Sequence, residues 1–439
     1  MAQVATRAMR PYQWLVVALC FVINMLDGFD VLVMAFAASS VSTAWSLSGT
    51  QLGYLLSAGL VGMALGSLFI APWADRFGRR PLILGCIALA GSGMLASSYA
   101  PTPVALGTLR LITGLGIGGI LASSYVIAGE YANDRWRGLA ISLQSTAYAL
   151  GATIGGFIAA KIIPSMGWQS VFFYGGLVTL ATLPLLAWLL PESLDFILNR
   201  QPRGALARAN RILARLHAPA LAALPSAKSI TRMPMASTIA QLFSAQSRAT
   251  TLLIWAGFFL VMFGFYFVMS WTPRLLVSAG LSTSQGITGG VLLNLGGIAG
   301  TALIGLLAAR YSLPRLLAGY MLANALVLSV FVMSSASLSL AYGVALLIGI
   351  FVNGCVAGLY AMTPSLYPVA QRVTGLGWAI GIGRAGAIAS PLVAGSLIDL
   401  HWSPAALYLL FAMAFVVAAM IVVLLSLRAR PQEHAAAAL

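Results

Sequence analysis

Charged residues are scarce in this chain, and acidic residues are the scarcest. Asp, Glu, Lys and Arg make up 8% of the 439 residues, and 9 residues are Asp or Glu. A soluble domain carries about 25% charged residues, so this composition excludes an ordinary soluble protein. The three cysteines and three histidines show no metal-ligand spacing, and no Walker loop or nucleophile elbow occurs. We therefore expect no enzyme, no ATP-driven pump, no cofactor and no metal.

Long apolar runs take the place of the missing charge. Hydrophobic residues make up 60% of the chain, and the mean hydropathy is +0.95. A helix that spans a bilayer needs roughly 20 apolar residues. Twelve segments of that length occur, six before and six after the polar stretch from 192 to 248. The sequence thus predicts an all-α membrane protein with twelve transmembrane helices.

The basic residues report the orientation of these spans. A net charge of +15 is compatible with a nucleic-acid partner, but 20 of the 24 basic residues fall in segments that an even-odd count puts on one side. This positive-inside pattern places both termini in the cytoplasm and argues for a lipid bilayer, not nucleic acid, as the partner. We expect a multi-pass protein of the plasma membrane, in bacteria the inner membrane.

The polar stretch divides the chain into residues 1–191, a cytoplasmic linker at 192–248, and residues 249–439. Within the linker, the spacing from Leu206 to His217 predicts an amphipathic helix with several arginines on one face. Such a helix suits the anionic lipid surface, and a regulatory docking site is the alternative.

The two halves resemble each other at a constant offset. Asp75 corresponds to Ala309 after 234 residues, and Gly151 corresponds to Gly386 after 235. Glu130 matches Ser365, again at 235. Two pseudo-symmetric six-helix repeats around a site at the membrane midplane are a transporter architecture.

Two carboxylates, Asp27 and Asp30, interrupt the first apolar run. An acid at such a depth is costly unless it is protonated, paired or facing water, and it usually belongs to an ion or proton pathway. The alternative is a structural acid paired with an arginine. Both side chains lie on the same side of a helix because they are three residues apart.

Two arginines also lie within spans. Arg384 is at a depth close to that of Asp27, among several glycines. It is a candidate for holding a substrate carboxylate through two parallel hydrogen bonds, and a permanent ion pair is the alternative. Arg110 has two alternative roles that the sequence supports equally. It takes part in proton coupling beside the acids of span one, or it serves helix packing.

Other side chains within the spans are weaker candidates for substrate contact. Aromatic residues are commonly used for packing, and buried amides for helix contacts, so each has a structural alternative. The candidates are Phe265, Tyr266, Trp378, Tyr148, Gln144 and Asn294.

Charges of both signs gather in the cytoplasmic loops of the first half. We interpret them as a salt-bridge latch of an inner gate, although simple orientation by positive charge also explains the arginines. The residues are Asp75, Arg76, Arg79, Arg80, Glu130, Arg135 and Arg137.

Three motifs support a family resemblance over the whole chain. The run Asp75-Arg-Phe-Gly-Arg-Arg80 resembles the signature loop of the major facilitator superfamily, although Ala71 stands where the pattern has glycine. Arg110-Leu-Ile-Thr-Gly-Leu-Gly116 and Pro191-Glu-Ser193 resemble two further marks of that superfamily. Within it, Asp27-Gly-Phe-Asp30 resembles the aromatic acid/proton symporter family.

The resemblance implies a proton-coupled importer of a small organic acid such as benzoate or hydroxybenzoate, which we expect to be monomeric. A drug exporter is the first rival, but Gly151-Ala-Thr-Ile-Gly-Gly156 lacks the proline common in exporters. A membrane sensor is the second rival, and it would not need deep acids beside a deep arginine.

Overall fold

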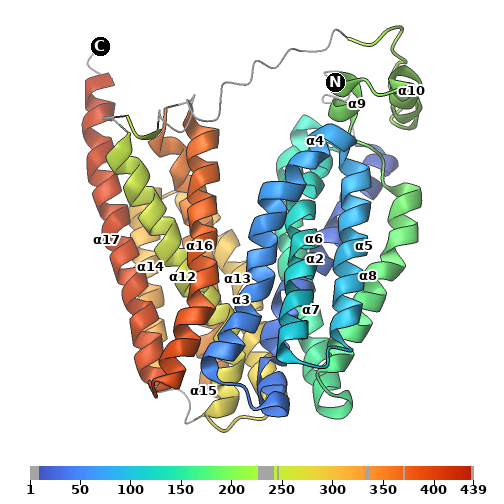
Figure 1. The fold of residues 1–439 in the computed structure, drawn as a ribbon. Helices are drawn as coiled ribbons and strands as arrows, with labels where there is room; N and C mark the ends of the chain where they lie inside the picture. Colours follow the sequence, from blue (N-terminus) through green and yellow to red (C-terminus); the bar gives the residue numbers. More distant parts are fainter. Residues whose placement is uncertain (1–8, 226–241, 245–246, 332–336, 369–370, 437–439) are drawn as a thin grey trace. The chain divides into compact units, whose positions relative to one another are not determined.

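The computed structural model describes residues 9–225, 242–244, 247–331, 337–368 and 371–436. Within these residues, twelve helices are long enough and apolar enough to cross a membrane. This finding confirms the twelve predicted spans. All regular elements in the described part of the chain are helices (Figure 1).

The first six spans form before the linker. Gly78 is the N-cap residue of the third span, which begins at Arg79. Before the fourth span the Thr102 hydroxyl accepts a hydrogen bond from the Ala105 N–H at 3.2 Å, which is a typical helix N-cap. Their helices are α2 (Pro11–Trp45), α3 (Gly49–Leu65), α5 (Arg79–Ser97), α6 (Pro103–Tyr131), α7 (Asp134–Met166) and α8 (Gln169–Leu189).

The second span continues beyond α3 in a wider and then a tighter helical form. A π-helical turn covers Gly66–Ile70, a 3-10 turn covers Ala71–Trp73, and α4 covers Ala74–Phe77. Pro72 lies in the 3-10 turn and has no backbone N–H to donate, so a regular α-helix is interrupted there.

The last six spans follow the linker. The second of them begins with a capping box, in which Ser282 and Gln285 each accept a hydrogen bond from the other's backbone N–H. The helices are α12 (Arg248–Ser278), α13 (Thr283–Ala308), α14 (Leu313–Phe331), α15 (Leu338–Met362), α16 (Arg372–Asp399) and α17 (Pro404–Ala436).

The linker contains two short helices, α9 (Leu194–Arg200) and α10 (Ala205–Arg215). The predicted amphipathic helix is α10: its apolar side, including Ala209 and Ile212, is buried in the core that α2 and α8 share. Arg208 and Arg211 on its other side are exposed. Linker residues 226–241 and 245–246 lie outside the described residues.

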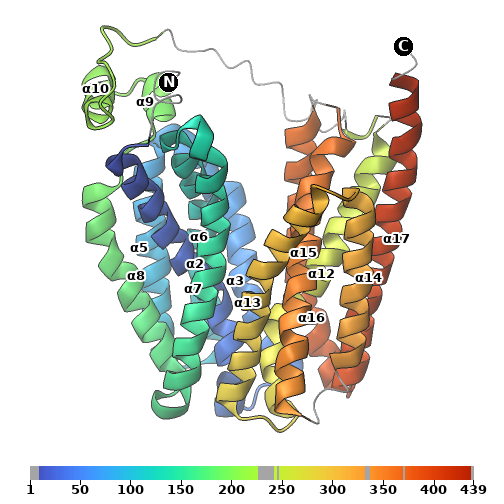
Figure 2. The same cartoon turned by 180° about the vertical axis from the view of Figure 1, so that it is seen from behind.

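The chain forms two compact units. The first comprises Met1–Val33, Ala58–Gly155 and Ser165–Thr231, and the second comprises Met34–Ser57, Gly156–Pro164 and Arg232–Leu439. In the first unit α5 packs on α6 and α8 (Figure 1). In the second unit α13 packs on α15, α12 on α16, and α14 on α17 (Figure 2). The division into halves at residues 192–248 stays a prediction.

Candidate functional site

The two acids of span one lie in the first unit, where α2 meets α7 closely. A Cβ atom on Gly28 would overlap the carbonyl oxygen of Tyr148, and a Cβ on Gly151 would overlap the carbonyl oxygen of Met25. The two glycines thus let the backbones of α2 and α7 touch. This contact fixes the rotation of α2 and thereby the direction in which Asp27 and Asp30 point.

Asp30 is paired with Arg110. The guanidinium Nη1 donates to Asp30 Oδ1 at 2.9 Å, and both side chains are buried. Arg110 Nη2 also donates to Ser97 Oγ at 2.8 Å and to Thr113 Oγ1 at 3.2 Å. The guanidinium carbon lies 4.7 Å from the centre of the Phe172 ring. Asp30 and Arg110 thus neutralise each other in the interior of the first unit.

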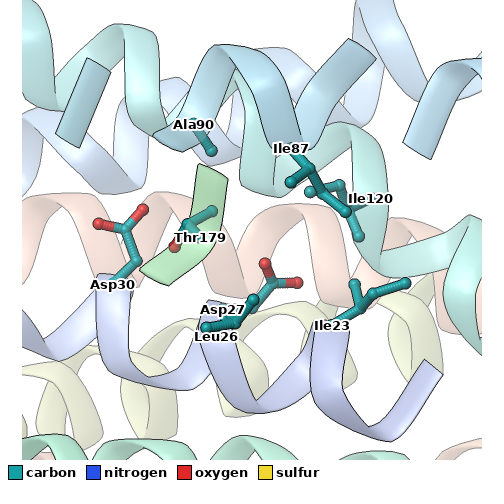
Figure 3. A pocket seen from close by; sticks show the side chains of 8 residues that line it. All are labelled: Ile23, Leu26, Asp27, Asp30, Ile87, Ala90, Ile120 and Thr179. Carbon is teal, nitrogen blue, oxygen red and sulfur yellow. The ribbon is translucent and has the colours of Figure 1, made fainter. Parts of the chain in front are cut away.

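Asp27 lies three residues earlier and lacks such a partner. Its Oδ2 atom is buried and has no hydrogen-bond partner among the described residues. Figure 3 shows Asp27 and Asp30 projecting from α2 into one pocket, which Ile87 and Ala90 of α5 and Thr179 of α8 also line. One motif therefore supplies an acid that is paired with an arginine and an acid whose Oδ2 has no hydrogen-bond partner among the described residues.

Arg384 lies on α16 in the second unit and is half-buried. Among the described residues it forms no ion pair and no hydrogen bond, and its electrostatic neighbour is Tyr266. The helix carrying it approaches α12 closely, because a Cβ on Gly386 would overlap the carbonyl oxygen of Phe259. The structure thus presents a cation within a span that lacks an acidic partner.

Aromatic side chains of the second unit surround the same pair of helices. Trp378 on α16 stacks on Trp255 of α12, with ring centres 6.0 Å apart. Phe265 and Tyr266 meet edge to face at 5.2 Å. Trp255 was not among the residues predicted from the sequence to contact substrate. Its Nε1 is buried and has no hydrogen-bond partner among the described residues.

Two of the polar candidates, Gln144 and Asn294, are buried and hydrogen-bonded within the protein. Gln144 is fully buried in the first unit and accepts a hydrogen bond from Asn24 at 3.0 Å. Asn294 is buried in the second unit and donates to the Gly290 carbonyl of its own helix at 2.9 Å. Tyr148, on α7, is half-buried. Asn24, which bonds to Gln144, was not among the residues predicted from the sequence.

The charged loop of the first unit forms a connected network. Gly78 has a φ of 107° and lies against the Glu192 carboxylate, which leaves no room for a side chain. Arg79 forms an ion pair with Glu130 and a hydrogen bond to Ser193. The Ser193 hydroxyl donates to Glu130 Oε2 at 2.6 Å. The signature loop is therefore joined to the end of α6 and the start of α9.

Glu192 completes this network. The sequence motif Pro191-Glu-Ser193 indicated the family resemblance but did not predict this contact of Glu192. Its Oε1 accepts hydrogen bonds from the backbone N–H groups of Arg79, Arg80 and Ser193 at 2.9, 3.2 and 2.8 Å. The N–H groups of Arg79 and Arg80 lie in the first turn of α5 and have no acceptor within that helix. A carboxylate at this position is also stabilised by the positive end of the helix dipole.

The remaining predicted gate residues have other contacts. Arg76 and Arg135 each lie 5.4 Å from the ring centre of the aromatic residue that follows them. Arg80 donates to the Ala187 carbonyl, and the Asp75 carbonyl accepts from Arg200 at 2.9 Å. Arg137 lies 3.8 Å from Asp134 in an exposed pair. The compact part of the network is thus centred on Arg79 and Glu130.

Comparisons with known proteins agree with this architecture. The chain is 38% identical over 398 residues to a gallate transporter of Pseudomonas putida, which covers 90% of this chain and 87% of that protein. It is 33% identical over 407 residues to the 4-hydroxybenzoate transporter PcaK of Pseudomonas aeruginosa, with 92% and 90% covered. The structure of a D-xylose-proton symporter shares the fold, with a TM-score of 0.73 at 17% identity and 94% and 97% of the two chains covered.

The sequence profile of the Major Facilitator Superfamily matches residues 17–357 and again residues 295–438. These two matches extend over nearly the whole chain, and the relatives named above cover about nine tenths of it. The chain therefore belongs to the Major Facilitator Superfamily and is a membrane transporter of a small molecule.

Proposed function

We propose that this protein imports an aromatic carboxylate together with protons across the bacterial inner membrane. Gallate and 4-hydroxybenzoate, the compounds in the names of two relatives, each combine a carboxylate with a hydroxylated ring. The chain offers a cation for the carboxylate, aromatic side chains for the ring and an acid for the proton.

The observation that carries the proposal is the state of Arg384. A cation within a span is costly unless it is paired or faces water, and Arg384 has no acidic partner among the described residues. A carboxylate from outside the protein would supply that partner through two parallel hydrogen bonds. Phe265, Tyr266 and Trp378 of the same unit would contact the ring. Tyr148, Gln144 and Asn294 remain weaker candidates, the last two because their side chains already form hydrogen bonds within the protein.

Proton coupling would use the acids of span one. Asp27 would bind and release the proton, because its Oδ2 has no partner among the described residues. Asp30 and Arg110 would hold a neighbouring neutral pair whose hydrogen bonds adjust as Asp27 changes charge. One proton and one monovalent anion form a neutral load, which lowers the cost of transfer through a low-dielectric site.

Transport would follow from the two repeats rocking around this site. In this proposal residues 1–191 and 249–439 are the moving halves, and the Arg79–Glu130 network is a latch at the cytoplasmic side. The basic residues of the loops keep both termini in the cytoplasm and contact anionic lipid headgroups. The working unit would be a monomer.

Uptake by purified protein in proteoliposomes tests the proposal. We expect radiolabelled 4-hydroxybenzoate to accumulate when the outside is made acidic, and a protonophore to abolish the accumulation. An uncharged aromatic drug should not be accumulated. Accumulation that ignores the proton gradient would refute coupling. Transport of cationic drugs without any transport of aromatic acids would support an exporter instead.

A further inference from the structure

Asn24 lies one helical turn before Asp27 on α2 and is fully buried. Its amide nitrogen Nδ2 lies within hydrogen-bond distance of three acceptors, the Cys20 carbonyl at 2.9 Å, Ser124 Oγ at 3.1 Å and Gln144 Oε1 at 3.0 Å, which share its two N–H groups. These partners belong to α2, α6 and α7, so the amide joins three helices of the first unit.

The partners of Asn24 determine which way its amide group is turned. Gln144 donates its own Nε2 to the Ala140 carbonyl at 2.9 Å, which directs its Oε1 toward Asn24. The Ser124 hydroxyl donates to the Leu121 carbonyl at 3.0 Å, so it accepts from Asn24. A reversed amide would set the Asn24 oxygen against the oxygens of Cys20 and Gln144. The nitrogen must therefore face these acceptors.

This orientation leaves the amide oxygen without a donor. Asn24 Oδ1 is buried and has no hydrogen-bond partner among the described residues, and the same holds for Asp27 Oδ2. Residues three apart on a helix are neighbours on one face, with Cβ atoms about 5–6 Å apart. Nδ2 is turned back toward Cys20, so Oδ1 on the same amide carbon faces away from that carbonyl, and it belongs to the residue one turn before Asp27.

The two protonation states of Asp27 interact differently with this oxygen. An ionised carboxylate can accept hydrogen bonds but cannot donate one, so it and the amide oxygen repel each other. A protonated carboxyl group has an O–H that can donate. We propose that Asn24 is a positioning residue for the coupling proton: its Oδ1 accepts a hydrogen bond from protonated Asp27, directly or through one water, and so favours the loaded state. The inference rests on the proposed proton-carrying role of Asp27.

Other groups also face Asp27 and set the background for this interaction. Asp30 lies on the same helix and is compensated by Arg110 of α6. Thr179 of α8 lines the same pocket, and the thiol of Cys86 on α5 and the phenol of Tyr125 on α6 are within electrostatic range. Tyr125 is hydrogen-bonded to Ser145 of α7 at 3.1 Å. These groups are the same in the wild type and in the Asn24 variants, so the comparison isolates the amide.

The test compares Asn24→Leu with Asn324→Leu in proteoliposomes. Asn324 lies on α14 in the second unit, is equally buried and has no partner for either amide atom among the described residues. Gradient-driven uptake of 4-hydroxybenzoate and exchange of preloaded substrate are measured as functions of pH. For Asn24→Leu we expect half-maximal uptake to require about a tenfold higher proton concentration, with exchange retained. Asn324→Leu should keep the wild-type pH profile.

A second variant protects the test against misfolding. Asn24→Ala removes the amide oxygen without adding another acceptor or a larger side chain, and it should shift the profile in the same direction. If the folded variants superimpose on a pH-dependent wild type, the inference is overturned while the proposed function stands. If wild-type uptake itself ignores the proton gradient, the coupling role of Asp27 fails, and this inference fails with it.

Discussion

Asp30 and Arg110, which lie 80 positions apart in the sequence, form a buried ion pair between α2 and α6, with Arg110 Nη1 2.9 Å from Asp30 Oδ1. The pair separates the roles of two acids that belong to one short motif. Asp30 is compensated by a guanidinium that two hydroxyl groups and an aromatic ring also hold. Asp27 points into the same pocket, and its Oδ2 has no partner in the described part of the chain.

The Asp30–Arg110 pair should matter strongly for stability. Removing one member leaves a buried charge uncompensated, so we expect Arg110→Leu to lower the free energy of unfolding by about 3–5 kcal/mol. The double variant Asp30→Asn/Arg110→Leu should recover part of that loss. Thermal unfolding in detergent measures the effect. Arg137→Gln, which breaks a pair with half-exposed side chains, is the control and should cost less than about 1 kcal/mol. Equal losses for both single variants would contradict the assignment.

Replacing the free acid should separate coupling from substrate movement. Asp27→Asn keeps the size of the side chain but cannot release a proton, so we expect it to abolish gradient-driven accumulation and to retain some exchange of preloaded substrate. Asp30→Asn should lie between Asp27→Asn and the wild type. The two assays are run on the same proteoliposomes. Accumulation by Asp27→Asn at the wild-type level would show that another group carries the proton.

Arg384 is expected to be the main electrostatic contact of the substrate carboxylate. Arg384→Ala should weaken binding of an aromatic acid by about 2–5 kcal/mol, because one side of a desolvated charge pair is lost. Arg384→Lys should rescue only in part, since lysine keeps the charge but not the planar fork. Calorimetry with an acid and its neutral amide measures both effects. If the acid and the amide lose affinity equally, Arg384 supports the structure, and the carboxylate is bound by another group.

The carboxylate of Glu192 should protect the start of α5. Glu192→Ala removes the acceptor of the Arg79, Arg80 and Ser193 backbone N–H groups. We expect hydrogen exchange at these amides to accelerate by about tenfold or more, because the donors lose their partner. Asp195→Ala changes an exposed acid in the first turn of α9 and is the control. Exchange rates that are the same in the two variants would place the support of α5 elsewhere.

The close approach of α2 and α7 should tolerate no side chain. A Cβ on Gly151 would overlap the carbonyl oxygen of Met25, whereas a Cβ on Gly85 would meet no atom within 4 Å. We expect Gly151→Ala to destabilise the protein by about 1–3 kcal/mol and Gly85→Ala to be neutral or slightly stabilising. The measurement is the shift in thermal unfolding temperature. A harmless Gly151→Ala would mean that the two helices can separate without loss.

The sequence alone determined the features that the bilayer imposes along the chain. Each span must be apolar over roughly 20 residues, so the number of spans can be counted without knowing any contact. The depth of Asp27 and Arg384 follows from the same count, because every residue of a helix advances by about 1.5 Å. Motifs at constant offsets revealed the duplication for a similar reason, since both halves keep their order.

The tertiary structure alone decided which groups are partners. The sequence left Arg110 between two roles, and the structure shows it bonded to Asp30. Glu192 accepts from Arg79 of α5, which lies 113 positions earlier in the sequence, and Gln144 is held by an amide of α2. These pairings depend on how each helix is rotated and where its backbone touches a neighbour. Contacts such as that of Gly28 with the Tyr148 carbonyl determine both the rotation of a helix and the place where it touches its neighbour. Such contacts join segments far apart in the sequence, so they cannot be predicted from the local spacing of apolar residues.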